Sequence, residues 1–474
     1  MTNPSHAIVQ PLPGRPRRSR GNPARRKTMN RYEAVKRRES RARTYASTFE
    51  AVFETAEGIR MRDQDGREII DCLACAGALP LGHNHPEVSE ALLRFIGSGQ
   101  VQQVLDLTTP AKFEFVQTLF GLLPAEWAER AKIQFCSPSG SDAIEAAMKL
   151  TRYATRRHPI IAFHGAYHGM TGGALAAMGN LGPKTDSGLR AGGVHFAPFP
   201  YRFRCPFGTD GEHTDRLSIQ YLANMLSDPE SGISKPAAVI VEVVQGEGGC
   251  IPASDEWLRE LRRLTREHEI PLVIDEVQTG FGRTGGMFAF ERAGIVPDVL
   301  VLSKAVGGGF PLAVVVYDQA LDLWPRGIHA GTFRGNQIGM VAGKVTMDIL
   351  RRDGLAEQAA RTGALLVDGL RELARRHPAL GDVRGRGLMI GVEVVGPDAA
   401  DGRPGPQDGA FAQAIKRAAF DHGLLIETGG RHGAVLRLLP PLIVTPQDVG
   451  EILDRLDRAV GQAEQRRPGG RRDR

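Results

Sequence analysis

The chain has 474 residues, of which 42% are hydrophobic and 24% are charged, a composition typical of a globular protein with a large core. This length corresponds to roughly two to four domains. The net charge of +6 conceals an uneven distribution, because residues 1–31 carry +8 and residues 466–474 carry +4, which leaves −6 for the rest. The basic character therefore belongs to the two ends, and nucleic acid is not the expected partner of the body.

Low-complexity and targeting features are confined to the termini. Residues 1–30 are rich in Pro, Gly and Arg and predict a disordered basic tail, and residues 464–474 predict a second one. No apolar stretch of the length of a signal peptide or a membrane span is present, so we expect a cytoplasmic protein without a membrane partner. Five cysteines, an odd and sparse set, predict free thiols. Cys72 and Cys75 have CxxC spacing but lack the second pair that a zinc site needs, so no metal is expected.

The region 31–85 predicts the first part of a small domain. Three short segments alternate in hydrophobicity, and turn residues at 63–66 separate the last two. This pattern predicts a small antiparallel meander. Its strands are expected at 51–55, 59–62 and 67–71.

From about Pro86 to residue 335, apolar strand-like runs alternate with helical segments. Helices are predicted at 142–156 and 257–268. Strands are predicted at 132–136, 160–163, 237–244, 271–275, 299–302 and 312–317. Continuously apolar strands between helices indicate a large domain with a mostly parallel sheet that is covered on both faces.

Residues 336–463 predict a smaller α+β domain. Its helices are expected at 336–352, 355–377, 410–422 and 446–461. Its strands are expected at 388–393, 424–427 and 434–439.

Two strand ends carry the most informative residues. Asp275 closes one buried run, and Lys304 follows another, before a run of glycines. Active sites of such sheets lie outside the carboxyl ends of the strands. A lysine and an aspartate at this place are what pyridoxal phosphate requires, because the lysine holds the cofactor as a Schiff base and the aspartate keeps the pyridine nitrogen protonated.

Three weaker motifs leave alternatives open. The stretch 137–145 lies between a strand and a helix, where backbone N–H groups suit a phosphate but also fit an ordinary helix cap. His164 and His168 are four residues apart but lack the intervening glutamate of a helical metal site. The acids of the stretch 241–249 stand at a strand end among glycines, and a solvated turn is the alternative there.

Taken together and in this order, the motifs resemble the class III aminotransferases of the pyridoxal phosphate fold type I superfamily, over about residues 31–463. The most specific block is Ile274-Asp-Glu-Val-Gln-Thr-Gly-Phe-Gly-Arg-Thr-Gly285 with Ser303-Lys304 behind it. The resemblance implies an α/β fold with a large mostly parallel-sheet domain and a smaller α+β domain. It also implies pyridoxal 5′-phosphate as cofactor and a homodimer with shared active sites.

The resemblance assigns cofactor roles to individual residues. Lys304 matches the Schiff-base lysine that also carries the proton, and Asp275 matches the partner of the pyridine nitrogen. Gln278 matches the residue near the phenolic oxygen of the cofactor, and Tyr167 matches the aromatic residue that stacks on its ring.

Further matches concern the phosphate and the substrate. Gly140 and Ser141 match the phosphate cradle, and Thr332 matches the threonine that reaches the phosphate of the neighbouring subunit's cofactor. Arg437 matches the arginine that binds a substrate carboxylate. Glu247 matches the glutamate that neutralises this arginine when a terminal amine enters instead.

Within the class, four blocks resemble the diaminobutyrate–2-oxoglutarate aminotransferases, namely residues 71–78, 82–86, 201–208 and 429–434. One departure is Cys75, where glycine is expected. The resemblance implies amino transfer between glutamate and aspartate 4-semialdehyde to give L-2,4-diaminobutyrate and 2-oxoglutarate. The alternatives are another class III transaminase for a terminal amine such as 4-aminobutyrate, an aminomutase that needs no 2-oxoglutarate, and a non-catalytic protein that binds nucleic acid through its tails. The pair of Lys304 and Asp275 argues against the last of these.

Overall fold

The computed structural model describes residues 31–188, 192–397 and 404–467, so the predicted tail at 1–30 and residues 468–474 of the predicted tail at 464–474 lie outside the described residues. The last helix extends to Gln465 and so includes the first two residues of that second tail. The chain divides into two compact units, Met1–Val52 and Phe53–Arg474. In the first unit, α1 (Arg31–Lys36) precedes the short helix η1 (Tyr45–Ser47), and the Tyr32 hydroxyl donates to the Ala46 carbonyl oxygen at 2.6 Å. The domain boundaries expected near residues 85 and 335 stay predictions.

The second unit begins with the predicted meander. Strands β1 (Phe53–Glu57), β2 (Arg60–Asp63) and β3 (Glu68–Asp71) pair in antiparallel order, which confirms the prediction from alternating hydrophobicity. A fourth strand, β15 (Leu424–Leu425), joins the edge of β3 in parallel. Residues separated by more than 350 positions in the sequence therefore share one sheet.

The central sheet has seven strands in the order β4-β12-β11-β10-β7-β5-β6. Their bounds are β4 (Ala131–Phe135), β5 (Ile160–Phe163), β6 (Val194–Ala197), β7 (Ala238–Val241), β10 (Leu272–Asp275), β11 (Val299–Leu302) and β12 (Val314–Asp318). The strands from β11 to β6 are parallel, whereas β12 runs antiparallel to both of its neighbours. The prediction of a mostly parallel sheet is confirmed.

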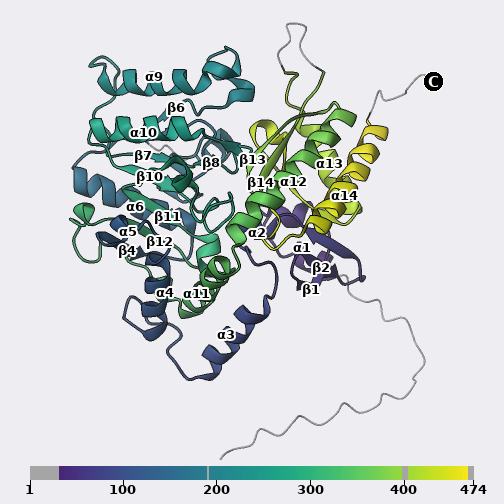
Figure 1. The fold of residues 1–474 in the computed structure, drawn as a ribbon, viewed down its shortest axis with the longest axis horizontal. Helices are drawn as coiled ribbons and strands as arrows, with labels where there is room; N and C mark the ends of the chain where they lie inside the picture. Colours follow the sequence, from purple (N-terminus) through teal and green to yellow (C-terminus); the bar gives the residue numbers. More distant parts are fainter. Residues whose placement is uncertain (1–30, 189–191, 398–403, 468–474) are drawn as a thin grey trace, which may run out of the picture. The chain divides into compact units, whose positions relative to one another are not determined.

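Helices cover both faces of this sheet (Figure 1). The side chain of Val273 shares one core with the apolar face of α6 (Gly140–Thr155). Its neighbours Leu272 and Ile274 share the other core with α10 (Asp255–Glu267) and α11 (Gln337–Arg352). Because successive side chains of a strand point to opposite faces, a strand that is buried on both sides must be continuously apolar.

A third sheet has the strand order β13-β14-β17-β16 and lies beside α12, α13 and α14 (Figure 1). Its strands are β13 (Leu380–Arg386), β14 (Met389–Val394), β16 (Glu427–Gly429) and β17 (Val435–Leu438). The helices are α12 (Leu355–Arg376), α13 (Gly409–Asp421) and α14 (Pro446–Gln465). The predicted single strand at 424–427 is thus two strands, β15 and β16, which belong to different sheets.

Shorter elements complete the second unit. The helices are α2 (Ala74–Gly77), α3 (Pro86–Gly97), α4 (Pro110–Phe120), α5 (Ala125–Ala128), α7 (Gly172–Ala176), α8 (Leu181–Asp186) and α9 (Thr214–Ser227). The strand predicted at 237–244 ends early, and β8 (Val244–Gln245) pairs instead with β9 (Ile251–Pro252). Over the described ranges, no helix combines the length and the apolar character that crossing a membrane requires.

Candidate active site

Lys304 and Asp275 lie together at the carboxyl edge of the central sheet. Asp275 is the last residue of β10, and Lys304 begins the short helix η5 (Lys304–Gly307) two residues after β11 ends. Because β10 and β11 are adjacent and parallel, both side chains reach the same pocket, which has a volume of about 200 Å³. The juxtaposition that we predicted from two strand ends is therefore present.

The Lys304 amine has the properties of a nucleophile. Its backbone φ of 51° lies in the left-handed region, where a side chain is strained, and such strain concentrates at functional sites. Burial lowers the pKa of Lys304. The carboxylate of Glu247 raises this pKa and the positive charge of Arg437 lowers it, and the net shift is downward. Within the described part of the chain, no carboxylate lies within 4.0 Å of the Lys304 amine. A desolvated amine without an ion pair loses its proton more readily and can attack a carbonyl carbon.

The carboxylate of Asp275 is fixed by two hydrogen bonds. Its Oδ1 accepts from the Val277 backbone N–H at 3.0 Å, and its Oδ2 lies 2.8 Å from Nδ1 of His168. Burial alone would lower the pKa of His168, but the bond to Asp275 and its charge outweigh this effect and raise it. Sequence reasoning considered His168 only as a metal ligand and missed this contact, because the partner lies more than 100 residues away.

Glu242 is a second residue to which the sequence pattern assigned no role beyond that of an acid at a strand end. Its Oε1 accepts from the Tyr167 backbone N–H and its Oε2 from that of Gly246, each at 2.9 Å. Burial is the main reason why the pKa of Glu242 rises to about 7. The charge of His168 lowers this pKa and the charge of Asp275 raises it. These bonds begin at the residue directly after β7, where the strand predicted at 237–244 ends early. They also fix the loop that presents Tyr167, whose half-buried ring lines the pocket.

The beginning of α6 forms one wall of the pocket. The backbone N–H groups of Gly140 and Ser141 find no acceptor among the described residues, and both residues line the pocket. The Ser141 hydroxyl accepts from the Met170 backbone N–H at 3.1 Å. Gly169 must be glycine, since a Cβ atom there would lie 1.9 Å from this hydroxyl oxygen. Free N–H groups at the start of a 16-residue helix suit a phosphate group.

Glu247 and Gln278 line the other wall of the pocket, and both bind Arg437, which lies behind them and does not itself line the pocket. One Arg437 nitrogen, Nη1, donates to Oε1 of Glu247 at 2.5 Å, and Nη2 donates to Oε1 of Gln278 at 3.2 Å. Gln278 in turn donates to the Ala76 carbonyl oxygen at 2.9 Å. The Arg437 side chain is 1% exposed and that of Glu247 is 37% exposed. Burial would raise the pKa of Glu247, but the charge and hydrogen bond of Arg437 outweigh it and lower the pKa.

Two residues that the sequence analysis named, Thr332 and Cys75, do not line this pocket. Thr332 begins the short helix η7 (Thr332–Gly335) and is exposed, and it does not line the pocket of its own chain. Cys75, the departure from glycine, has a φ of 51° and therefore adopts the left-handed conformation that glycine accommodates best. All five cysteines are free thiols, as predicted.

The residues present fit pyridoxal phosphate. The pocket combines an amine without an ion pair, a fixed and buried carboxylate, and two N–H groups without acceptors. These groups match a carbonyl carbon, a protonated ring nitrogen and a phosphate, respectively.

Comparisons with known proteins agree with this geometry. The model of the class-III aminotransferase family matches residues 41–460. The chain is 54% identical over 419 residues to a diaminobutyrate–2-oxoglutarate aminotransferase of Rhizobium meliloti, covering 88% of this chain and 89% of the relative. It is 44% identical to a protein of the same name from Haemophilus influenzae, covering 90% of this chain and 93% of the relative.

Solved structures share the fold. An amine transaminase from an uncultivated Pseudomonas species, solved with pyridoxal phosphate bound, has a TM-score of 0.79 at 28% identity and covers 87% of this chain and 95% of its own. An (S)-enantioselective omega-transaminase from Thermomicrobium roseum has a TM-score of 0.82 at 27% identity and covers 92% of this chain and 100% of its own. The α/β architecture with a large mixed sheet is that of the pyridoxal phosphate-dependent transaminases of fold type I, and the chain belongs to the class-III aminotransferase family.

Proposed function

We propose that this chain binds pyridoxal 5′-phosphate and transfers an amino group between glutamate and aspartate 4-semialdehyde, giving L-2,4-diaminobutyrate and 2-oxoglutarate reversibly. The observation that supports the proposal is the pocket that Lys304, Asp275 and Glu247 line together, with the buried Arg437 paired to Glu247 behind it. The names of the Rhizobium and Haemophilus relatives support the choice of substrates.

Each pocket residue has a distinct task in this proposal. When bound, the cofactor supplies an electron-accepting ring. Lys304 would hold it covalently and then move a proton at Nζ between the substrate carbon and the ring substituent. Asp275 would keep a proton on the ring nitrogen, and Tyr167 would cover the ring face. Gln278, held by Ala76 and Arg437, would orient toward the phenolic oxygen.

The substrate end of the pocket must serve two unlike donors. Glutamate brings a carboxylate beside its amino group, whereas diaminobutyrate presents a terminal amine without one. Arg437 would bind the carboxylate of glutamate, and Glu247 would pair with Arg437 when the diamine occupies the pocket. An arginine that is 1% exposed needs a partner in both states, because an unpaired buried charge is costly.

A homodimer with shared sites belongs to the same proposal. Thr332 is exposed, as are the apolar side chains of Phe333 next to it in the chain and of Leu105 and Leu107 in a neighbouring segment. Arg334 and Asp106 join their two segments through an ion pair at 2.5 Å. Such a patch is typical of a protein–protein contact, and a second copy of this chain would bring Thr332 to the neighbouring phosphate. The cytoplasmic location stays a prediction.

The test is an amine-donor screen on the purified enzyme with 2-oxoglutarate as acceptor and a Lys304→Ala variant as the background control. We expect diaminobutyrate to give the highest kcat/KM and to yield glutamate. Preference for 4-aminobutyrate or a similar amine would replace the substrate assignment within the same family. Product formation without any 2-oxoglutarate would indicate an aminomutase.

The dimer is tested with mixed dimers. One mixed dimer pairs a Lys304→Ala chain with a Thr332→Ala chain, and the other pairs a doubly substituted chain with an unchanged one. If Thr332 serves the neighbouring site, only the first combination keeps one complete site and about half of the wild-type activity. The opposite ranking, or a monomer by light scattering, would contradict the shared site.

A further inference from the structure

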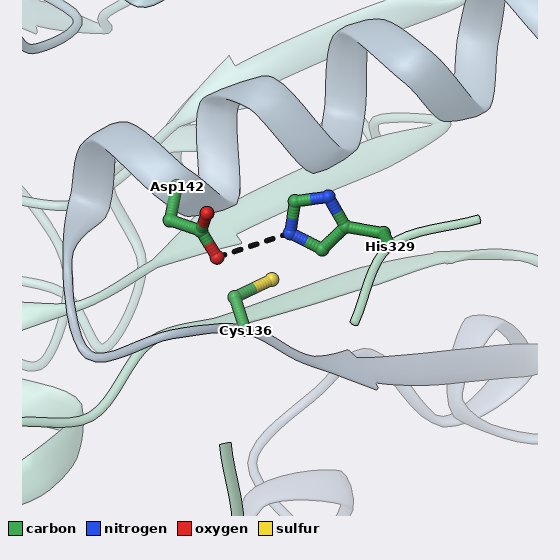
Figure 2. Close-up of side chains that lie close together, drawn as sticks. All are labelled: Cys136, Asp142 and His329. Atoms are coloured by element: carbon green, nitrogen blue, oxygen red, sulfur yellow. Dashed lines mark hydrogen bonds and ion pairs between the residues drawn. The ribbon is translucent and has the colours of Figure 1, made fainter. Parts of the chain in front are cut away.

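A cluster of three side chains lies directly behind the phosphate-binding wall. Cys136 follows β4, Asp142 lies in the first turn of α6, and His329 comes from the segment before η7, and all three point toward one another (Figure 2). Their potential ligand atoms lie within 4.8 Å of one another. A thiol, an imidazole and a carboxylate are the donor types that zinc prefers, so a metal site is the first interpretation to examine.

The hydrogen bonds of His329 argue against a metal. Nε2 of His329 lies 3.0 Å from Oδ2 of Asp142, and Nδ1 lies 3.4 Å from the Lys149 ammonium. An ammonium can only donate, so Nδ1 accepts and Nε2 carries the hydrogen that it donates to Asp142. Both ring nitrogens are therefore in use. Burial and the neighbouring charge of Asp142 also raise the pKa of the Cys136 thiol well above its ordinary value, which opposes the thiolate that zinc needs.

Asp142 connects these hydrogen bonds to the pocket wall that Gly140 and Ser141 form at the beginning of α6. The same oxygen that accepts from His329 also accepts from the Ser137 backbone N–H at 2.8 Å. This bond closes the turn 137–142, which contains Gly140 and Ser141. Burial would raise the pKa of Asp142, but the bonds from His329 and Ser137 outweigh it and lower the pKa, so the carboxylate stays ionised and accepts strongly.

The segment that carries Thr332 contacts the same turn, 137–142. The His329 carbonyl oxygen accepts from Nη1 of Arg334 at 3.0 Å and from Gln134 at 3.3 Å. Gly331 approaches Ser137 so closely that a Cβ atom at position 331 would lie 2.2 Å from the Ser137 hydroxyl oxygen. The turn 137–142 and the segment 329–335 thus touch through a side-chain pair and through a close backbone approach.

We propose that His329 is a positioning residue for the phosphate group of the cofactor. Its bond to Asp142 holds the turn with Gly140 and Ser141 and the segment with Thr332 in one arrangement. His329 then acts on the phosphate of its own subunit through the turn, and on that of the neighbouring subunit through Thr332. The inference rests on the proposed function, since it assumes that the turn receives the phosphate of pyridoxal phosphate.

The experiment compares two ligands that differ only in the phosphate. The apoenzyme is titrated with pyridoxal 5′-phosphate and with pyridoxal, and binding is followed by absorbance and by intrinsic fluorescence. We expect His329→Ala to weaken pyridoxal phosphate at least about tenfold, as for the loss of a charge-assisted hydrogen bond, and to change pyridoxal less than about twofold. His329→Gln places an amide N–H near the position of Nε2 and should recover most of the affinity. Circular dichroism and the Tm of each apoenzyme establish that the variants fold.

Cys136→Ser is the matched control, because Cys136 belongs to the cluster but takes no part in the bond between His329 and Asp142. It should bind both ligands like the wild type. Equal losses for both ligands in His329→Ala, or no loss for either, would overturn the proposal that His329 positions the phosphate. One zinc ion bound per wild-type chain and lost in Cys136→Ser would overturn it in favour of a metal site. A wild-type enzyme that binds pyridoxal phosphate no better than pyridoxal would instead refute the phosphate assignment in the proposed function.

Discussion

The pair of Arg437 and Glu247 yields the most discriminating prediction. Arg437→Ala removes the guanidinium that would bind the carboxylate of glutamate, and such a charge-assisted interaction contributes about 1.5–3 kcal/mol. We therefore expect the glutamate half-reaction to slow roughly 10- to 150-fold. The diaminobutyrate half-reaction should slow far less, because its donor has no carboxylate beside the reacting amine.

Glu247→Ala should have the opposite effect. With the diamine bound, Arg437 would keep its 3.2 Å bond to Gln278 but would lose its only carboxylate partner among the described residues, and its charge would stay buried. Because the Glu247 side chain is 37% exposed, water can replace part of its contribution, so we expect a loss of about tenfold instead of the full effect of a broken buried pair. The glutamate half-reaction should be nearly unchanged, since the substrate carboxylate then neutralises the arginine.

Single-turnover absorbance measurements of each half-reaction test both variants. Asp298→Ala is a matched control, because Asp298 holds the buried Arg262 through two bonds of 2.5 and 2.8 Å at the opposite end of β11. It should lower stability without favouring either donor. Equal losses in both half-reactions for both pocket variants would refute the exchange of partners and would reduce Arg437 and Glu247 to structural supports.

The remaining predictions concern the centre of the pocket. Lys304→Ala should abolish turnover while circular dichroism stays that of the wild type, and normal turnover would disprove the assignment of the lysine. Asp275→Asn should lower kcat by at least about a hundredfold, or ~2.8 kcal/mol of barrier, and near wild-type kcat with bound cofactor would contradict its role at the ring nitrogen. For Glu242, the pKa of about 7 in the folded chain exceeds the ordinary 4.5, so the folded apoenzyme retains this proton and loses stability as pH rises from about 4.5 to about 7. Glu242→Gln should remove up to about 3 kcal/mol of this loss in urea denaturation at several pH values, and parallel pH profiles for both proteins would contradict the assignment.

The parts of the site that the sequence predicted well are those that local pattern determines. Lys304 and Asp275 each follow a buried strand, and the rule that parallel strands end at one edge was enough to bring them together. The helix that begins at Gly140 was recognisable for the same reason, because a strand of alternating apolar and polar residues, a short polar turn and a helical repeat follow one another. In each case the signal lies within about ten residues.

The parts that were missed depend on contacts between distant segments. His168 gains its role from Asp275, and Glu242 gains its role from two backbone N–H groups, one of them 75 residues away. Strand β13 was not predicted because its sequence, with Arg384 and Arg386, lacks the continuous apolar run of the central strands. Both arginines find acceptors there, in the Gly249 carbonyl oxygen and in the Asp255 carboxylate, and such partners cannot be read from the sequence of the strand itself.

The geometry also indicates which of the two substrate-binding residues, Arg437 or Glu247, moves when the donor changes. Arg437 lies inside β17, where it pairs in register with Gly391 of β14 and Glu427 of β16, so its backbone is held on both sides. Glu247 lies instead in the turn between β8 and β9 among three glycines, and its side chain is partly exposed. Moving the glutamate breaks one ion pair, whereas moving the arginine would break that pair and the bond to Gln278 and would expose a side chain that is packed in the core. We therefore expect the arginine to stay in place for both donors and the glutamate to withdraw when a carboxylate arrives. The choice between an α-amine and a terminal amine would then rest on the flexibility of a glycine-rich turn beside a fixed cation.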